Sequence, residues 1–294
     1  MASQNLFREK KLGPDVLKKY VQSIYKNFST IAYICVLISL IAAGTLLIFY
    51  PEGLTFILKE DSITETLGAV FLFLTSLNLF LSSFNEFKLS IQSKKNSRIK
   101  YLLLVLAAIA FFWAGGEEIS WGQRILEIDT PEVLMVVNQQ RELNLHNINT
   151  RFFNNALETI ILLCIIVPTI LKTKGIERVF GFFIPSFSVV LGFQLISCYV
   201  TYSYIKPQDC FSYIFLLYYF YSFFRAQDWK NLNYILVNTI VIVFLALINT
   251  SLRAELPTNG PRELREFLFA FLCYAYSIEI IMDQKILYLL GIKK

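Results

Sequence analysis

Residues 101–124 read YLLLVLAAIAFFWAGGEEISWGQR, an apolar run that ends in two adjacent glutamates. A run of this length can cross the hydrocarbon core of a bilayer as a helix. Ionisable side chains at that depth are costly, and they usually face a protein interior or a wet cavity, where they serve a function. The segment therefore predicts a membrane-spanning helix and places the candidate site at its glutamates.

The rest of the chain has the same character. Of its 294 residues 55% are hydrophobic and only 17% are charged, whereas soluble domains carry about 25% charged residues. Continuous apolar stretches recur, without the alternation of a β-barrel, so the predicted fold class is an all-α, polytopic transmembrane helix bundle with about eight spans. The expected spans are 28–50, 66–84, 101–123, 155–171, 179–204, 209–224, 232–252 and 267–289.

Charge sets the expected topology. Segment 1–27 is predicted to be a cytoplasmic amphipathic lead-in, with a simple soluble lead-in as the alternative, and 28–294 a single membrane domain with an external loop at 125–154. With the N-terminus inside, 19 of the 27 lysines and arginines fall on the cytoplasmic side, as the positive-inside rule requires. We therefore expect both termini to be cytoplasmic, in the inner (cytoplasmic) cell membrane. The net charge of +5 is a topology signal and does not point to nucleic acid.

On this layout, acids from four spans lie at one depth near the external surface. Glu117 is about 24 Å from the cytoplasmic start of its helix at about 1.5 Å per residue. Glu65, Glu158 and Glu266 begin or nearly begin three other spans on the same side. Because these segments are separate, their agreement predicts a buried acidic site on the extracytoplasmic side.

Spacing within the third span predicts which side chains share a helix face. Glu117, Ser120, Trp121 and Arg124 follow the i, i+3, i+4, i+7 pattern of one face. Glu118 projects away from them by about 100°. Two neighbouring carboxylates in a low dielectric can carry a proton, hold a cation or orient a nucleophile.

The external loop is expected to cap this acidic layer. It is rich in amides and carries His146, the one histidine of the chain. The catalytic candidates are Glu117, Glu118, Arg124 and His146. The candidate binding residues are Glu65, Trp121, Gln123, Asn144, Asn147, Glu158 and Glu266.

Polar residues elsewhere in the spans have more ordinary expected roles. Asn78, Gln194 and Asn238 are mid-span amides, which typically hydrogen-bond between helices. Glu279 and Asp283 lie near the inner end of the last span and are expected to pair with lysines. They are also the only inner-side candidates for an ion path.

The histidine count limits the metal chemistry. A zinc hydrolase needs several histidine or cysteine ligands, which one histidine cannot supply. A hard divalent cation held by carboxylates and amides remains open as a cofactor. Nothing resembles a P-loop, a dinucleotide-binding turn or a nucleophile elbow.

Three stretches carry a family resemblance: Glu60-Asp-(x3)-Glu65, Gly116–Arg124 and Glu142–Asn147. Together they resemble a family of uncharacterised bacterial multi-pass membrane proteins, over about residues 40–170. The resemblance implies a multi-pass membrane fold and no established activity. The Glu117-Glu118 pair also resembles that of CAAX-type intramembrane proteases. Those enzymes need two further histidine motifs, which this chain lacks.

These observations leave three functions open. The first is a membrane-embedded enzyme for a lipid-linked or amphiphilic substrate, with Glu117 or Glu118 as general base, Arg124 holding an anionic headgroup and His146 as the second acid–base group. The second is a proton- or cation-coupled transporter or channel. The third is a structural subunit of a membrane complex. The sequence indicates neither the substrate or ion nor the oligomeric state.

Overall fold

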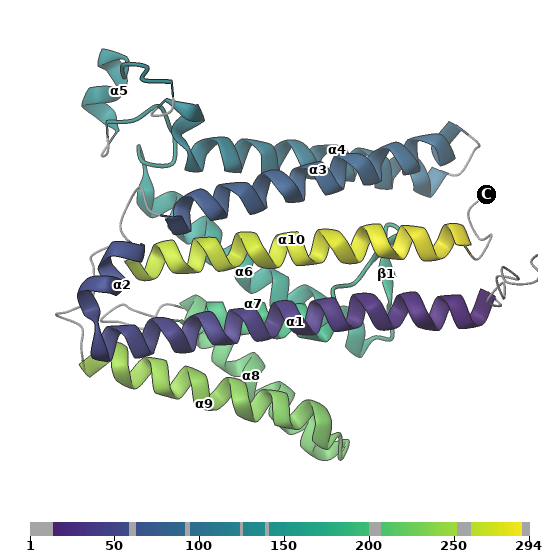
Figure 1. Cartoon of the computed structure of the whole chain (residues 1–294). Coiled ribbons are helices and arrows are strands. Elements are labelled where there is room, and N and C mark those ends of the chain that lie inside the picture. Colours follow the sequence, from purple (N-terminus) through teal and green to yellow (C-terminus); the bar gives the residue numbers. More distant parts are fainter. Residues whose placement is uncertain are drawn as a thin grey trace, which may run out of the picture.

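The computed structural model describes residues 14–58, 63–91, 95–123, 126–138, 141–199, 207–251 and 260–289. Long helices run side by side through the molecule (Figure 1), and over these ranges one two-residue β-pair interrupts the helical pattern. The predicted all-α class is confirmed. The start of α1 and the end of α10 lie at the same end of the bundle (Figure 1), an arrangement that fits termini on one side. Which side is cytoplasmic stays a prediction.

The elements follow in chain order. They are α1 (Pro14–Phe49), α2 (Pro51–Leu58), α3 (Ile63–Ile91), α4 (Lys95–Glu118), the 3-10 turn η1 (Ser120–Gly122), α5 (Glu132–Val137), α6 (Thr150–Thr173), β1 (Arg178–Val179), β2 (Phe182–Phe183), α7 (Phe187–Ser197), α8 (Pro207–Arg225), α9 (Trp229–Ser251) and α10 (Gly260–Leu289).

Within the described residues, five helical stretches are long and apolar enough to cross a membrane. They are Asn27–Phe49, Pro51–Phe87, Arg98–Glu118, Thr150–Thr173 and Trp229–Ile248. The protein is therefore a multi-pass membrane protein by length and composition, in contact with the lipid bilayer. α8 and α10 are also long helices, but they are not among these five stretches. The tyrosines of α8 and the charged residues of α10 lower their hydropathy.

Several predicted boundaries differ from the structure. α1 runs without a break from Pro14, so the expected lead-in continues into the first span. The expected span 179–204 contains instead a β-hairpin and α7, whose 11 residues extend about 16 Å, roughly half of a bilayer core. Ser186 caps α7 by accepting a hydrogen bond from the Val189 N–H, so the helix begins well inside the expected span.

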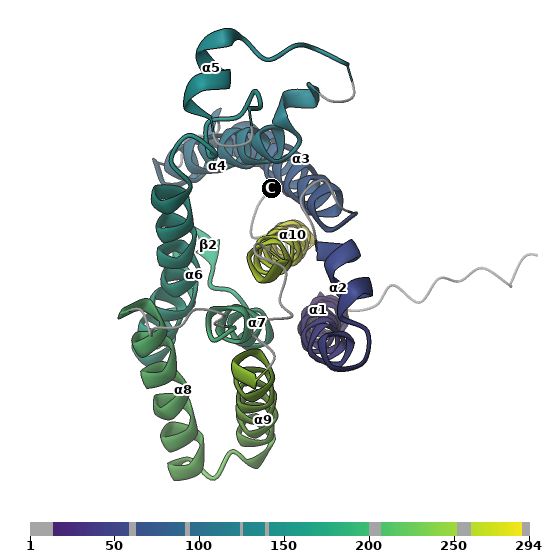
Figure 2. The same ribbon diagram turned by 90° about the vertical axis from the view of Figure 1, so that its left-hand side faces the viewer.

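α10 is the central helix of the bundle. It packs on α3, α1 and α7, and in Figure 2 it lies inside a ring of other helices. Leu268, Leu272 and Ala275 of α10 are almost fully buried. Because its neighbours shield it from lipid, α10 can carry charged residues near both of its ends.

The mid-span amides join helices, as predicted. Each amide forms a hydrogen bond with a residue of another helix, because lipid chains offer no hydrogen-bond partner within a span. Asn78 donates to Ser277 of α10 (2.9 Å), Gln194 donates to the carbonyl oxygen of Ser212 in α8 (2.6 Å), and Asn238 accepts from the Tyr33 hydroxyl of α1.

Two ion pairs, one buried and one partly exposed, lie near the end of the bundle where α1 begins. Lys100 of α4 contacts Glu86 of α3 at 3.0 Å, with both side chains at most 3% exposed. Asp283 of α10 accepts hydrogen bonds from Arg178 of β1, one of them at 2.7 Å. Asp283 was expected to pair with a lysine such as Lys285, whose side chain lies outside the described part of the chain; the partner that the structure gives it is the arginine of the hairpin.

Glu279 of α10 completes this inner cluster, which we define as Glu86, Lys100, Arg178, Glu279 and Asp283. Its carboxylate accepts hydrogen bonds from the hydroxyl of Ser29 and from the backbone N–H of Ser186 (3.0 Å). Each acid of the inner cluster therefore has a cation or hydrogen-bond donors of its own.

Candidate functional site

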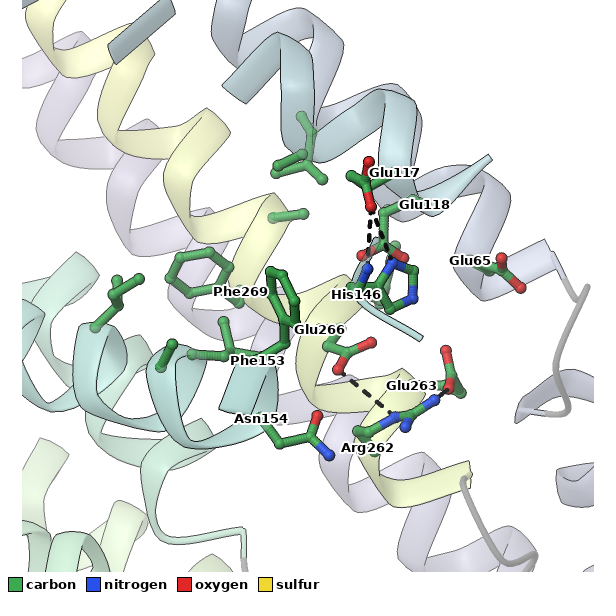
Figure 3. Close-up of a pocket in the computed structure, with 18 of the residues that line it drawn as sticks. Glu65, Glu117, Glu118, His146, Phe153, Asn154, Arg262, Glu263, Glu266 and Phe269 are labelled. Atoms are coloured by element: carbon green, nitrogen blue, oxygen red, sulfur yellow. Dashed lines mark hydrogen bonds and ion pairs between the residues drawn. The ribbon is translucent and has the colours of Figure 1, made fainter. Parts of the chain in front are cut away.

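A cavity of about 260 Å³ lies at the opposite end of the bundle. Its walls come from the start of α3, the end of α4, the start of α6 and the start of α10, with His146 from the loop 125–154 that was predicted to be external (Figure 3). Helices far apart in the chain therefore bring their polar ends to one place. Five of the predicted site residues line the cavity: Glu65, Glu117, Glu118, His146 and Glu266.

Negative charge is in surplus around this cavity. Its described lining includes Glu65, Glu117, Glu118, Glu263 and Glu266, but Arg262 is the one arginine or lysine there. Arg262 contacts the Glu263 carboxylate at 2.9 Å and the Glu266 carboxylate at 3.7 Å. Like charges repel strongly where water is scarce, so this lining is suited to take up protons or a positively charged group.

Glu117 has a structural set of contacts. Its Oε1 accepts a hydrogen bond from the Trp121 indole N–H at 2.9 Å. Its Oε2 accepts from the backbone N–H groups of Leu145 (2.6 Å) and His146 (3.1 Å). Hydrogen bonds to a charged acceptor contribute about 1.5–3 kcal/mol each, so Glu117 fastens the external loop to the end of α4.

Glu118, the next residue, has the opposite environment. Within the described residues its carboxylate makes no hydrogen bond or ion pair, and it lines the cavity. Figure 3 shows it between Glu117 and the acids of α10. Its strongest charge interactions are repulsive, with Glu266, Glu263 and Glu65, and Arg262 opposes them. Two neighbouring glutamates thus have different roles, one in the scaffold and one in the cavity.

The turn after Glu118 explains this division. Ser120 (φ 47°), Trp121 (φ 55°) and Gly122 (φ 75°) all have left-handed backbone conformations, which cost about 1–2 kcal/mol at a non-glycine residue. The turn folds the Trp121 ring back onto Gly116, where an added Cβ would lie only 2.7 Å from the ring. Glycine at 116 therefore permits the Trp121–Glu117 hydrogen bond.

The same turn corrects a prediction. Because α4 ends at Glu118, the residues from Glu117 to Arg124 do not share one helix face. Trp121 still reaches Glu117, by the tight turn and not by helical spacing. Arg124 lies outside the described residues, so its predicted role is neither supported nor opposed.

The predicted amides act inside the external loop. Gln123 donates to the Thr130 hydroxyl and accepts from the Leu143 N–H at 2.6 Å. Asn144 donates to the Ser120 hydroxyl at 3.0 Å, and Asn147 is also buried. The residues that line the cavity do not include these three amides. Their contacts give the loop its shape and thereby position His146.

Glu158, predicted as part of the acidic layer, is paired apart from the cavity. It accepts a hydrogen bond from Arg265 at 3.0 Å, and both side chains are buried. This pair joins α6 to α10 beside the site. Sequence reasoning did not single out Arg262 or Arg265, although both stand beside acids at the start of the last span.

His146 is the imidazole of the site. It lines the cavity, and its Nδ1 lies 3.7 Å from Glu117 Oε2. Burial lowers the pKa of His146 from its ordinary value; the Glu117 carboxylate opposes this change, and the charge of Arg262 adds to it. The side chain is therefore held in the neutral form, in which it can accept a proton.

The carboxylates are not gathered as a metal centre. Among the described residues, no three acidic, histidine or cysteine side chains are grouped to hold a metal ion. Glu60 and Asp61 lie outside the described residues. A divalent cation as cofactor stays a prediction without geometric support.

Comparison of the chain with protein-family models, with curated proteins and with solved structures found no match. The resemblance drawn from the sequence motifs therefore stays a prediction, and the proposed function rests on the geometry of the site.

Proposed function

We propose that the protein is a membrane-embedded enzyme that acts on an amphiphilic or lipid-linked substrate at the cavity. The observation that carries this proposal is Glu118, a carboxylate directed into a half-apolar cavity without a hydrogen-bond donor of its own among the described residues. A carboxylate without a hydrogen-bond donor adds no stability to the fold. A general base, however, needs a carboxylate oxygen that can accept a proton from water or the substrate.

The proposed chemistry is a proton-assisted hydrolysis or group transfer. Glu118 takes a proton from water or a substrate hydroxyl as that oxygen bonds to the electrophilic centre. Glu266, which lines the same cavity, delivers a proton to the leaving group as its bond breaks. Glu117 is the weaker candidate for base, because both of its oxygens already accept hydrogen bonds.

The charge of the lining favours certain headgroups. The surplus of glutamates repels an anionic group and attracts a headgroup that bears amines or hydroxyl donors. Arg262, held by Glu263 and Glu266, orients these two carboxylates toward the substrate. The predicted anionic headgroup at Arg124 is a separate hypothesis, which the described residues do not address.

The test is the variant Glu118→Gln in lipid nanodiscs made with a polar lipid extract. General acid–base groups typically contribute about 10²–10⁴-fold to rate, so lipid species that the wild type consumes, followed by mass spectrometry, should persist with the variant. Glu132→Gln, at an exposed loop glutamate, is the matched control and should retain turnover. Wild-type turnover in Glu118→Gln would refute the proposed role.

The charge surplus also favours a second candidate, a proton- or cation-coupled transporter. Polar groups of the inner cluster lie at the other end of the bundle, and two of them, Glu279 and Asp283, are on α10. These two acids were the inner-side candidates for an ion path that the sequence predicted. Between the two ends, however, α10 presents the apolar stretch from Phe267 to Cys273. Cation flux into proteoliposomes that disappears in Glu118→Gln, without any lipid turnover, would favour transport over catalysis.

A further inference from the structure

The cavity has two chemically different halves. The acids, Arg262 and His146 occupy one side, and apolar side chains occupy the other (Figure 3). The apolar half includes Trp113, Leu157, Ile160, Phe267 and Phe269. A site with one polar and one apolar half matches an amphiphile better than a small polar molecule.

Three apolar residues of the lining also lie on the outer surface of the bundle. Trp113 of α4 is 51% exposed, and Phe153 and Ile160 of α6 are 40% and 47% exposed. A side chain that borders both a cavity and the outer surface marks the edge of an opening. The opening therefore lies between α4 and α6.

The packing of these two helices explains the opening. α4 packs on α3, whereas α6 packs on α7 and α8. In Figure 2 α4 is seen nearly end-on while α6 is seen from the side, so α6 is strongly inclined to α4. The two helices are close at the loop that joins them, and they separate toward the middle of the bundle.

The opening lies at the depth of hydrocarbon chains. Trp113 is five residues before the end of α4, which corresponds to about 7 Å along this helix. Both helices are candidate membrane spans. An apolar opening at this depth meets lipid and not water, since filling it with water leaves the water without hydrogen-bond partners.

We propose that the apolar half binds the hydrocarbon chain of a membrane lipid, which enters sideways between α4 and α6. The inference rests on the proposed function in that the headgroup then lies beside Glu118. At about 260 Å³ the cavity is smaller than the roughly 300–1,000 Å³ of ordinary ligand pockets. It holds the headgroup region and the first part of the chain, while the rest stays in the bilayer.

The test uses a phosphatidylcholine with a photoreactive diazirine near the start of one acyl chain. The full-length protein is placed in nanodiscs containing this lipid, illuminated and analysed by peptide mass spectrometry. We expect preferential labelling of the peptides with Trp113 and Phe153 over other lipid-facing segments. Ile160→Trp should block the opening and reduce this labelling at least fivefold. Val167→Trp, an exposed position farther along α6, should not.

Each result bears on one proposal. Uniform labelling of all lipid-facing helices, or labelling that Ile160→Trp leaves unchanged, would overturn the chain site. A water-soluble alkyl diazirine can be added as a competitor of the lipid probe. If it reduces the labelling of these peptides as much as Ile160→Trp does, the site is reached from water, and this result would also overturn the chain site. Glu118→Gln should leave labelling unchanged, since the chain does not contact this carboxylate. Loss of turnover in that variant with unblocked labelling in Ile160→Trp would preserve the enzyme and remove only the chain site.

Discussion

The two ends of the helix bundle differ in how their charged side chains are paired. In the inner cluster, Glu86 has Lys100 and Asp283 has Arg178, at distances typical of strong ion pairs. The described lining of the outer cavity holds five glutamates and one arginine, and Glu118 has no donor among the described residues. The same three helices, α3, α4 and α10, contribute charged residues at both ends, so the difference does not follow from which helix carries the charge. Under the proposed function, the inner charges stabilise the fold and the outer charges take part in the reaction.

The largest effect on stability is expected from breaking the inner pair. Lys100→Met leaves the Glu86 carboxylate buried without its cation, which typically costs about 3–5 kcal/mol. The measurement is the free energy of unfolding by SDS in mixed micelles. The double variant Glu86→Gln/Lys100→Met removes both charges and should recover much of the loss. If Lys100→Met were as stable as the wild type, the inner ion pair would not stabilise the fold, contrary to this account.

Adjacent positions allow a finer version of the comparison. In Glu117→Gln the amide NH₂ group faces at least one N–H that now donates to the carboxylate, so at least one of three hydrogen bonds is lost. The expected loss of stability is about 1.5–3 kcal/mol. Hydrogen exchange of the backbone amides of residues 141–149 should then become faster. Glu118→Gln is the matched control and should leave this exchange unchanged. Equal acceleration by both substitutions would show that the two glutamates do not differ.

The smallest expected effect is a pH dependence at His146. Its pKa in the folded protein is below the ordinary value of 6.5, so the unfolded chain binds the proton first as the pH falls. The associated stability is fully present above pH 6.5 and is lost between 6.5 and the lowered pKa, by at most about 1.4 kcal/mol per pH unit. Unfolding between pH 7.5 and 5 should show this loss in the wild type and less of it in His146→Gln. Identical pH profiles would contradict the prediction.

Much of the architecture could be predicted from hydropathy, because apolar runs of membrane length leave few alternatives to a helix. The meeting of Glu65, Glu117, Glu118 and Glu266 followed from the depth of each span. The expected span 179–204 failed because hydropathy does not separate a buried short helix such as α7 from a full span. Its eight residues from Val189 to Ile196 are all buried in protein and not exposed to lipid.

The different environments of Glu117 and Glu118 could not be predicted from the sequence. They depend on the left-handed turn at Ser120 and Trp121, which is stabilised by contacts with Glu142 and Asn144, more than twenty residues later in the chain. Helical spacing extrapolated through this turn gave the wrong shared face. The Arg178–Asp283 pair is likewise set by tertiary packing over a long sequence separation.

The most direct test of the central claim is the free energy of unfolding of Glu118→Gln, measured in mixed micelles beside the wild type. If Glu118 is kept for function without a partner among the described residues, removing its charge relieves repulsion with Glu266, Glu263 and Glu65. The variant should then be at least as stable as the wild type while its turnover is lost. A loss of several kcal/mol, similar to that expected for Lys100→Met, would contradict the account and would make the outer carboxylates structural.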